Sequence, residues 1–344
     1  MKPHEAAHFI HQVPKVELHV HLEGATDAET VWAMAQRNGI ALPASSLQDW
    51  KENYRFRDFE HFIEIYGLAT SVMRRPEDWS FMVERFLFGQ AQQNIVYTEA
   101  FLSASYQICN LPMDEWIDAI AEGASIGERQ HGVKVRFLPD ISRHLPDTQE
   151  AVLQCAIEAG KREHFIGLGL GGIEDGYPAD LFVETYQEAK RHGLRVVAHA
   201  GETTGPQTIC DVIQKLGAER IGHGVRCLED DKLVSELCEN RIPLEVCPTS
   251  NYCLGVVERD QPHPLRRMVD AGLYCTVNSD DPPMFSTTLN DEYILLVEQG
   301  FSLAELNQLN LNAVDASFLP DDEKATMRWR IEAVSPFFND VLKR

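Results

Sequence analysis

The sequence predicts an α/β protein of the (β/α)8 or TIM-barrel class, and three observations support this. Short apolar segments of strand length alternate with amphipathic helical segments along the chain. Eight such strand segments can be found, and a chain of 344 residues has room for eight βα units in one domain. The first strand is followed by His-Leu-Glu-Gly-Ala and not by a GxGxxG turn, which disfavours the alternative of a doubly wound open sheet.

The eight expected strands are apolar, and most are flanked by glycine or polar residues. In chain order they are Val16–Leu22, Ile95–Leu102, Val133–Ile141, Ile166–Gly171, Leu194–His199, Arg220–Val225, Pro243–Cys247 and Leu273–Ser279. In a barrel of parallel strands, the residues that follow each strand meet at one rim, where active sites of this architecture lie. We therefore look for chemistry at the strand ends.

The helices between the strands carry boundary signals. Asp27 precedes an amphipathic segment as an N-cap would, and Gly193 suits a left-handed C-cap. After the last strand we expect two further helices, 290–300 and 303–318, followed by a polar tail. Because no repeat or Pro/Gly/Ser-rich linker interrupts the pattern, we expect a single domain over residues 1–344.

More than seventy residues separate the first two strands, and we expect them to form a helical insertion over about 27–92. Within it, Phe59, Phe62 and Tyr66 recur at helical spacing. Such a helix would pack on the barrel. Because long insertions after barrel strands usually cover the mouth, we also expect an apolar lid in which Phe59 and Phe62 contact the substrate.

Charge and composition exclude several function classes. The net charge of −22 argues against a nucleic acid partner, which needs clustered Lys and Arg, but is compatible with a small uncharged ligand. No stretch approaches the ~20 apolar residues of a membrane span, and the N-terminus lacks a signal-peptide pattern. The eight cysteines form no CxxC pair and lie mostly in apolar segments, which predicts reduced thiols in a cytoplasmic protein. Homo-oligomer formation stays open.

Several metal-binding residue types gather at strand ends. His19 and His21 are two residues apart in a strand, so both side chains point into the barrel. His199 ends the fifth strand, His223 follows in the sixth, and Asp280 and Asp281 end the eighth. Burying so many polar groups in one place is costly unless they share a ligand.

Three imidazoles and one carboxylate, from His19, His21, His199 and Asp280, suit Zn2+ with a position left for water. Fe2+ or another divalent ion has compatible ligand chemistry. Two-metal barrels often use a modified lysine at the end of strand four, where this chain has Gly-Leu-Gly-Leu-Gly-Gly. We therefore expect one metal ion per chain.

Five motifs resemble those of the adenosine deaminase family of the amidohydrolase superfamily, in the same order from residue 14 to about 285. They are PKVELHVHLEGA at 14–25, HAGET at 199–203, IGHGVR at 221–226, LEVCPTSN at 244–251 and NSDDPPMF at 278–285. The resemblance implies a zinc-dependent aminohydrolase that replaces the 6-amino group of an adenine-type purine by oxygen. Hydroxide would attack C6, and the tetrahedral intermediate would collapse with loss of ammonia.

The resemblance also implies roles for residues of the site. Glu202 would be the general acid and base that protonates purine N1, and His223 would orient the attacking hydroxide. Asp280 would bind the metal and take a proton from the water. Asp281 would hydrogen-bond to N7, and the backbone N–H of Gly172 would face N3.

The substrate is less clear because the chain departs from the adenosine-specific pattern. Glu23 stands where adenosine-specific members carry an aspartate for the ribose; adenine deaminases and enzymes acting on 5′-modified nucleosides such as aminodeoxyfutalosine also have glutamate there. The chain lacks the Ser-Ser-Glu pattern typical of the adenine branch. We predict an adenine nucleoside, adenosine or a 5′-modified analogue, bound in part by Glu23. There are two alternatives. The chain could deaminate free adenine, or it could be another mononuclear amidohydrolase that acts on a different ring amine.

Overall fold

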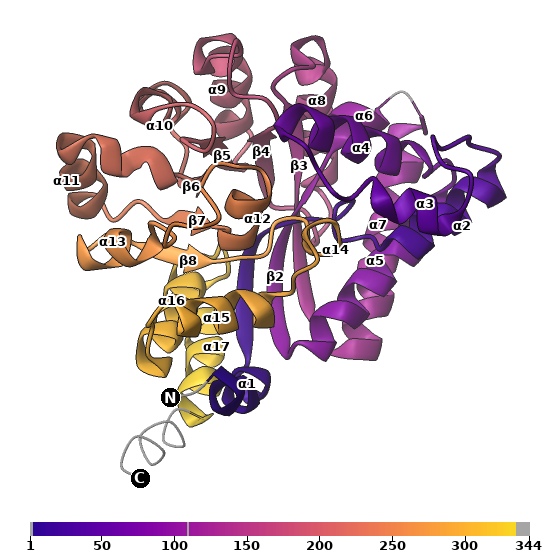
Figure 1. The fold of residues 1–344 in the computed structure, drawn as a ribbon. Coiled ribbons are helices and arrows are strands. Elements are labelled where there is room, and N and C mark those ends of the chain that lie inside the picture. The colour runs from indigo at the N-terminus through magenta and orange to yellow at the C-terminus, as the bar shows by residue number, and fades with distance from the viewer. Residues whose placement is uncertain (1–2, 109, 335–344) are drawn as a thin grey trace.

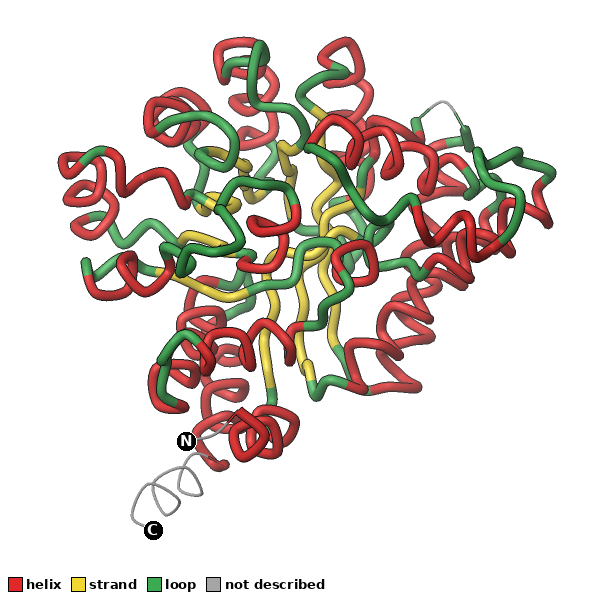
Figure 2. The backbone as a smooth tube through the Cα atoms, in the orientation of Figure 1, coloured by secondary structure: helices red, strands yellow, loops and turns green. Residues whose placement is uncertain are grey.

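A computed structural model describes residues 3–108 and 110–334 of the chain (Figure 1). Eight parallel strands form one sheet in the order β1 to β8. A bridge between Val20 and Asp280 joins the first strand to the residues after the last one. Figure 2 shows the strands at the centre with helices around them. The predicted (β/α)8 barrel is confirmed.

The strands match the eight expected segments and differ from them only at their ends. They are β1 (Lys15–His21), β2 (Ile95–Leu102), β3 (Lys134–Ser142), β4 (Gly167–Gly171), β5 (Arg195–Ala200), β6 (Arg220–His223), β7 (Leu244–Val246) and β8 (Cys275–Val277). Almost every strand residue is buried, as expected for a parallel sheet covered by helices on the outside and filled by side chains within.

Four helices fill the long segment between β1 and β2: α2 (Ala28–Asn38), α3 (Leu47–Glu52), α4 (Phe59–Ser71) and α5 (Pro76–Gln92). The Asp27 carboxylate accepts a hydrogen bond from the backbone N–H of Thr30 at 2.7 Å and so caps α2. Helix α5 packs along α7 (Met113–His131) on the outside of the barrel, whereas α4 lies near the mouth (Figure 1). Only α4 therefore brings side chains of this segment to the cavity described below.

The remaining helices follow the strands or lie beyond the barrel. They are α1 (Pro3–Gln12), α6 (Ala104–Gln107), α8 (Gln149–Ala159), α9 (Val183–Arg191), α10 (Pro206–Asp211), α11 (Asp231–Glu239), α12 (Pro248–Cys253), α13 (Leu265–Asp270), α14 (Pro282–Phe285), α15 (Leu289–Glu298), α16 (Leu303–Ala316) and α17 (Asp321–Val334). Helices α15 and α16 are the two that the sequence predicts. Within the described ranges, none of these helices is long and apolar enough to span a bilayer.

The expectation of a polar tail after α16 is wrong for residues 321–334, which form α17; the last ten residues lie outside the described part of the chain. Helix α17 is rich in charged residues, and Met327 and Ile331 are its only buried residues. Two apolar positions four residues apart give too weak a periodicity to predict a helix from sequence. Seven of the cysteines are free thiols, and Cys109 lies outside the described residues.

Candidate active site

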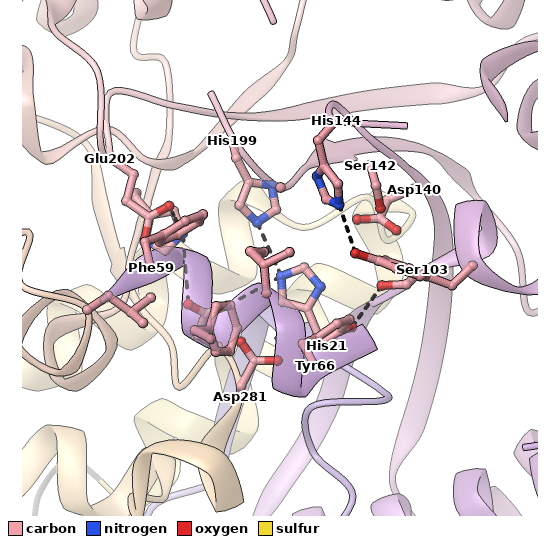
Figure 3. Close-up of a pocket in the computed structure, with 17 residues that line it drawn as sticks. His21, Phe59, Tyr66, Ser103, Asp140, Ser142, His144, His199, Glu202 and Asp281 are labelled. Carbon is pink, nitrogen blue, oxygen red and sulfur yellow. Dashed lines mark hydrogen bonds and ion pairs between the residues drawn. The ribbon is translucent and has the colours of Figure 1, made fainter. Parts of the chain in front are cut away.

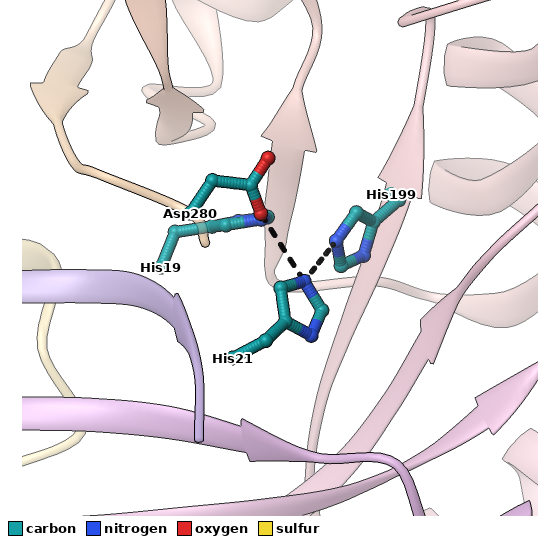
Figure 4. Close-up of side chains that lie close together, drawn as sticks. All are labelled: His19, His21, His199 and Asp280. Carbon is teal, nitrogen blue, oxygen red and sulfur yellow. Dashed lines mark hydrogen bonds and ion pairs between the residues drawn. The ribbon is translucent and has the colours of Figure 1, made fainter. Parts of the chain in front are cut away.

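Four side chains at the barrel mouth form a compact cluster (Figure 4). His19 and His21 come from β1, His199 from β5, and Asp280 follows β8. The Nε2 atoms of His21 and His199 lie 3.2 Å apart, and Asp280 Oδ1 lies 3.3 Å from His21 Nε2 and 3.4 Å from His19 Nε2. The offered ligand atoms all fall within 4.8 Å of one another, so one ion can contact all four residues. The structure thus brings together the ligand set that the sequence predicts.

Hydrogen bonds on the far side of the rings suit a cation between them. His199 Nδ1 lies 2.8 Å from the carbonyl oxygen of Leu170, so Nδ1 carries the proton and Nε2 presents a lone pair. His19 Nδ1 is held in the same way by Glu245 Oε2 at 2.9 Å. Burial lowers the pKa of His199 well below its usual range, which keeps this ring neutral. Imidazoles oriented in this way, together with a carboxylate, form a ligand set that fits a divalent ion such as Zn2+.

Asp280 of this cluster and His223, the last residue of β6, have unusual backbone conformations. His223 has φ 61° and Asp280 has φ 64°, in the left-handed region that residues with side chains rarely occupy. Backbone hydrogen bonds fix Asp280, since its carbonyl accepts from the N–H of His21 at 2.9 Å and its N–H donates to the carbonyl of His19 at 3.1 Å. Strain of this kind, held by the surrounding sheet, is typical of functional sites.

Glu202 lies in the turn after β5, next to the cluster. Its Oε1 is buried with no hydrogen-bond partner in the described part of the chain, and its Oε2 lies 3.8 Å from His223 Nε2. Burial, with Asp280 and Glu174 nearby, raises the pKa of Glu202 well above its usual range. A carboxyl group whose pKa is raised in this way keeps its proton to higher pH and can act as a proton donor.

Glu174, which sequence reasoning missed, holds the turn that carries Glu202. Its carboxylate accepts hydrogen bonds from the backbone N–H groups of Gly201, Glu202 and Thr203 at 3.0, 2.9 and 3.1 Å, and from the hydroxyl of Thr204. One side chain therefore satisfies four donors of a tight turn. Its position two residues after the glycine run of β4 was the available sequence signal.

A chain of hydrogen bonds fixes the orientation of His223. The backbone N–H of Leu265 donates to His263 Nδ1 at 3.1 Å, so His263 Nε2 carries the proton that Asn251 Oδ1 accepts at 3.1 Å. The Asn251 amide nitrogen then donates to His223 Nδ1 at 3.3 Å. His223 is left with its proton on Nε2, the atom that faces Glu202 and Asp280. Burial lowers the pKa of His223 to about 3, so the ring is a neutral donor.

Asp281 points toward the cavity beside Asp280. Its Oδ1 is buried and has no hydrogen-bond partner among the described residues. Burial first, then Asp280, raises the pKa of Asp281 well above its usual range, so the carboxyl can donate a hydrogen bond. A Cβ atom at Gly24 would lie 1.6 Å from this oxygen, so only glycine leaves room for Asp281. Sequence reasoning did not single out Gly24, although the His-Leu-Glu-Gly-Ala motif contains it.

These groups face a cavity of about 480 Å3 that opens to solvent (Figure 3). Its apolar wall comes from Phe59, Phe62 and Ile63 of α4, together with Leu254. Gly172, with φ 81°, lies in the wall, where a Cβ atom would come within 2.8 Å of His144 Nδ1. No Lys or Arg occurs among the described residues that line the cavity.

Two predicted site residues, the metal-ligand candidate His19 and the substrate-contact candidate Glu23, do not line this cavity. Glu23 lies behind the wall. It is 1% exposed, and its Oε1 accepts a hydrogen bond from the backbone N–H of Ser103 at 2.9 Å. The hydroxyl of Tyr66 lies 3.5 Å from Oε2 and 2.8 Å from Ser103 Oγ. Burial raises the pKa of Glu23 to about 7. The side chain thus supports the cavity wall from behind, and a direct contact between Glu23 and substrate stays a prediction.

A second group, His223, Cys247 and Asp280, also has ligand atoms within 4.8 Å of one another. It shares Asp280 with the first cluster, and the Cys247 thiol is buried, which raises its pKa well above its usual range. A protonated thiol is a poor metal ligand, so the cluster of three histidines is the better divalent site.

Comparison with known proteins agrees with this geometry. A sequence model described as adenosine deaminase matches residues 14–334. An aminodeoxyfutalosine deaminase from Streptomyces avermitilis is 36% identical over 333 residues, covering 94% of this chain and 92% of the relative. The crystal structure of an adenine deaminase from Arthrobacter aurescens superposes with a TM-score of 0.89 at 32% identity, covering 93% of this chain and 98% of that one.

A further crystal structure, of an amidohydrolase from Burkholderia ambifaria with bound Zn, has a TM-score of 0.87 at 28% identity. It covers 98% of this chain and 93% of that chain. Both the family match and these relatives extend over nearly the whole barrel, including every motif from which the site is built. The chain therefore belongs to the adenosine deaminase family.

Proposed function

We propose that this chain is a purine aminohydrolase that replaces the 6-amino group of an adenine nucleoside by oxygen and releases ammonia. One observation carries the proposal: a buried, unpartnered carboxyl oxygen of Glu202 faces the same cavity as the cluster of His19, His21, His199 and Asp280. A proton donor next to a site for a divalent ion is what hydrolysis of an aromatic amine requires.

His19, His21, His199 and Asp280 would hold one Zn2+ per chain, with Fe2+ as the alternative. The zinc-containing relative from Burkholderia ambifaria supports this choice of metal. When bound, the ion supplies Lewis acidity, which lowers the pKa of a coordinated water toward ~7.

The side chains around this position have complementary tasks. Glu202 donates its proton to purine N1, which makes C6 electrophilic, while the Nε2 proton of His223 orients the attacking water. Asp280 accepts a proton from that water. The new C6–O bond forms, the C6–N bond breaks, and the amino group leaves as ammonia after taking up a proton. Asp281 donates to N7, and the N–H of Gly172 donates to N3.

The side chains that line the cavity favour an uncharged substrate over a nucleotide, because none of the described lining residues is a Lys or Arg. Asp140, Glu202, Asp280 and Asp281 line it, and its described lining includes no Lys or Arg that could pair with a phosphate. Hydroxyl groups of Ser103, Ser142 and Tyr106 also line it, as a sugar would need. We infer an adenine nucleoside, either adenosine or a 5′-modified analogue such as aminodeoxyfutalosine.

Free adenine is the second candidate, because the relative from Arthrobacter aurescens is named an adenine deaminase. A substrate with a different ring would not present three acceptors matching the proton donor to N1 and the hydrogen-bond donors to N3 and N7.

We also propose that residues 1–344 act as one catalytic domain and that α4 serves as an apolar lid. Phe62 is 7% exposed and its ring centroid lies 5.4 Å from that of Phe285, while Phe59 packs on Phe62. This aromatic layer lies on the cavity wall and would exclude water from a bound purine ring.

The test is a substrate panel followed by ultraviolet absorbance, which shifts when a 6-aminopurine becomes a 6-oxopurine. Adenosine, aminodeoxyfutalosine and adenine are compared with the purified enzyme. Glu202→Gln should keep its metal and lose about 10²–10⁴-fold in kcat, whereas Glu184→Gln, on the exposed face of α9, serves as the matched control. Absence of turnover with every 6-aminopurine would refute the proposed reaction, and near-normal activity of Glu202→Gln would refute the role of Glu202.

A further inference from the structure

Asp140, near the end of β3, is a buried carboxyl in the cavity wall that the reaction described above does not use. The residue is 3% exposed, and its Oδ1 has no hydrogen-bond partner among the described residues. Figure 3 shows Asp140 and Glu202 on opposite sides of His21 and His199. Asp140 therefore faces a part of the cavity on the other side of these two histidines from the proton donor.

Two glycines of the neighbouring strand make room for this carboxyl. Asp140 pairs with Gly169 across β3 and β4, where a Cβ atom would lie 2.8 Å from Asp140 Cβ. A Cβ atom at Gly171 would lie 3.0 Å from Asp140 Oδ2 and 3.4 Å from His199 Cε1. The local sequence thus admits a carboxyl beside His199, although a buried carboxyl oxygen without a partner costs stability. A bound molecule that supplies the missing partner would account for that cost.

The polar groups around Asp140 form a hydrophilic end of the cavity. Ser103, Ser142 and Tyr106 line it, and the Tyr106 hydroxyl lies 2.8 Å from His144 Nε2. Glu23 is close by but lies behind the wall, with Oε1 occupied by the Ser103 N–H. Of the two carboxyl groups on this side, only Asp140 is among the residues that line the cavity.

The orientation of the purine decides what Asp140 meets. If N1 contacts Glu202 and N7 contacts Asp281, the N9 side of the ring system lies away from Glu202, toward Asp140. The group on N9 of a nucleoside is a sugar, whose hydroxyls both donate and accept hydrogen bonds. A phosphate on that sugar would meet a carboxyl there, and no lining Lys or Arg would pair with it.

We propose that Asp140 determines substrate specificity by hydrogen-bonding a sugar hydroxyl of the bound nucleoside, the contact that the sequence assigns to Glu23. This inference rests on the proposed function, because that function sets the direction of the N9 substituent. A site built to hydrogen-bond a substrate hydroxyl rejects the analogue that lacks it, since the buried group is then left unpaired.

The experiment measures kcat/KM for adenosine, its 2′-, 3′- and 5′-deoxy analogues, and free adenine. It uses the zinc-loaded wild type, Asp140→Ala, the volume-conserving Asp140→Asn, and Glu23→Gln as the matched control for a nearby buried carboxyl. For the wild type, one deoxy analogue should react about 10- to 100-fold less efficiently than adenosine. Asp140→Ala should lower kcat/KM for adenosine by the same factor and leave that analogue nearly unaffected, while Asp140→Asn gives an intermediate ratio.

The ratio between adenosine and the deoxy analogue is the informative quantity, because a structural defect would lower both rates together. Glu23→Gln should preserve this ratio. Removal of a carboxyl whose Oδ1 has no partner among the described residues should also leave the thermal unfolding midpoint of Asp140→Ala and Asp140→Asn unchanged or raise it.

Three results would overturn the assignment. An unchanged ratio in Asp140→Ala would show that Asp140 does not sense the sugar. An equal loss for adenine and adenosine would show that it binds the N9–H edge of the base instead. A wild type that deaminates adenosine but does not discriminate against any deoxy analogue would refute the inference while the proposed reaction stands. Failure to deaminate any 6-aminopurine would refute the proposed function, and this assignment with it.

Discussion

Glu174→Gln tests whether the turn that carries Glu202 is held in place by a single carboxylate. In the wild type, Glu174 Oε1 accepts from the N–H groups of Glu202 and Thr203, and Oε2 accepts from the N–H of Gly201 and the hydroxyl of Thr204. The substitution keeps the shape of the side chain. It removes the negative charge and turns one acceptor oxygen into a donor.

The magnitude follows from the donors that lose their acceptor. The amide nitrogen is best placed toward Thr204, whose hydroxyl can rotate and accept, but the N–H of Gly201 then faces another donor. If the nitrogen takes the other position, the N–H groups of Glu202 and Thr203 both lose their acceptor. At about 1.5–3 kcal/mol for a hydrogen bond to a charged group, the turn is destabilised by about 2–5 kcal/mol. A shift of about 1 Å in a catalytic group can cost about 10²-fold in rate.

We therefore expect Glu174→Gln to lower kcat/KM about 100-fold and to lower the thermal unfolding midpoint. Metal content should stay at the wild-type level, because Glu174 touches none of the four ligand side chains. Asp175→Asn, at the exposed neighbouring position, is the matched control and should behave as wild type. Activity of Glu174→Gln within about threefold of wild type, with the variant folded and metal-loaded, would show that the turn holds its shape without this carboxylate.

Three further outcomes follow from the structure. Complete removal of the metal by a chelator should abolish activity and lower the unfolding midpoint, and added Zn2+ should restore both; a metal-free protein with full activity would contradict the ligand assignment. Gly172→Ala should lower kcat/KM about tenfold or more, because φ is 81° and the new Cβ would lie 2.8 Å from His144 Nδ1. Gly176→Ala, with φ 79° and open space around it, is the control that shows the effect of backbone strain without a steric clash. Burial raises the pKa of Glu292 to about 7 from 4.5, so its stabilising contribution is complete below about pH 4.5 and lost as pH rises through 7. Denaturant titrations should therefore show the free energy of unfolding of wild type falling by about 3 kcal/mol relative to Glu292→Gln over that range, and parallel pH curves would rule this out.

The metal cluster could be predicted from sequence because two simple rules act together. The alternation of side chains along a strand puts His19 and His21 on one face, and the barrel brings the ends of β1, β5 and β8 to one rim. His199 and Asp280 then have to meet them. Neither rule depends on details of packing, so the four ligands are found within 4.8 Å of one another without any need for loop geometry.

The substrate end of the cavity could not be predicted in this way. Glu23 and Asp140 are both acidic residues near strand ends, and the strand pattern does not distinguish them; only the family resemblance favours Glu23. The choice depends on the neighbours, since Gly169 and Gly171 open space beside Asp140 whereas the Ser103 N–H holds Glu23 behind the wall. Acidic residues within apolar strands were the available signal for Asp140. The partners of His223 were hidden for a similar reason, because His263 reaches Asn251 only through the path of an irregular loop.

The helices beyond the barrel also contribute to the metal site, through a line of buried polar groups under His19. Glu245 binds His19 Nδ1 with one oxygen and Arg220 with the other, and the Arg220 guanidinium also pairs with Glu99 at 2.6 Å. The ring of Phe318, which follows α16, lies 3.9 Å below the guanidinium carbon, and a carbonyl at the end of α16 accepts from Arg220. The two carboxylates balance the charge of this buried arginine, and the Ala316 carbonyl of α16 supplies an acceptor for Nη1, while Nη2 has no hydrogen-bond partner among the described residues. The orientation of His19, the first of the proposed metal ligands, therefore depends on a segment far beyond the last strand, which supports the proposal that the barrel and its C-terminal helices form one domain.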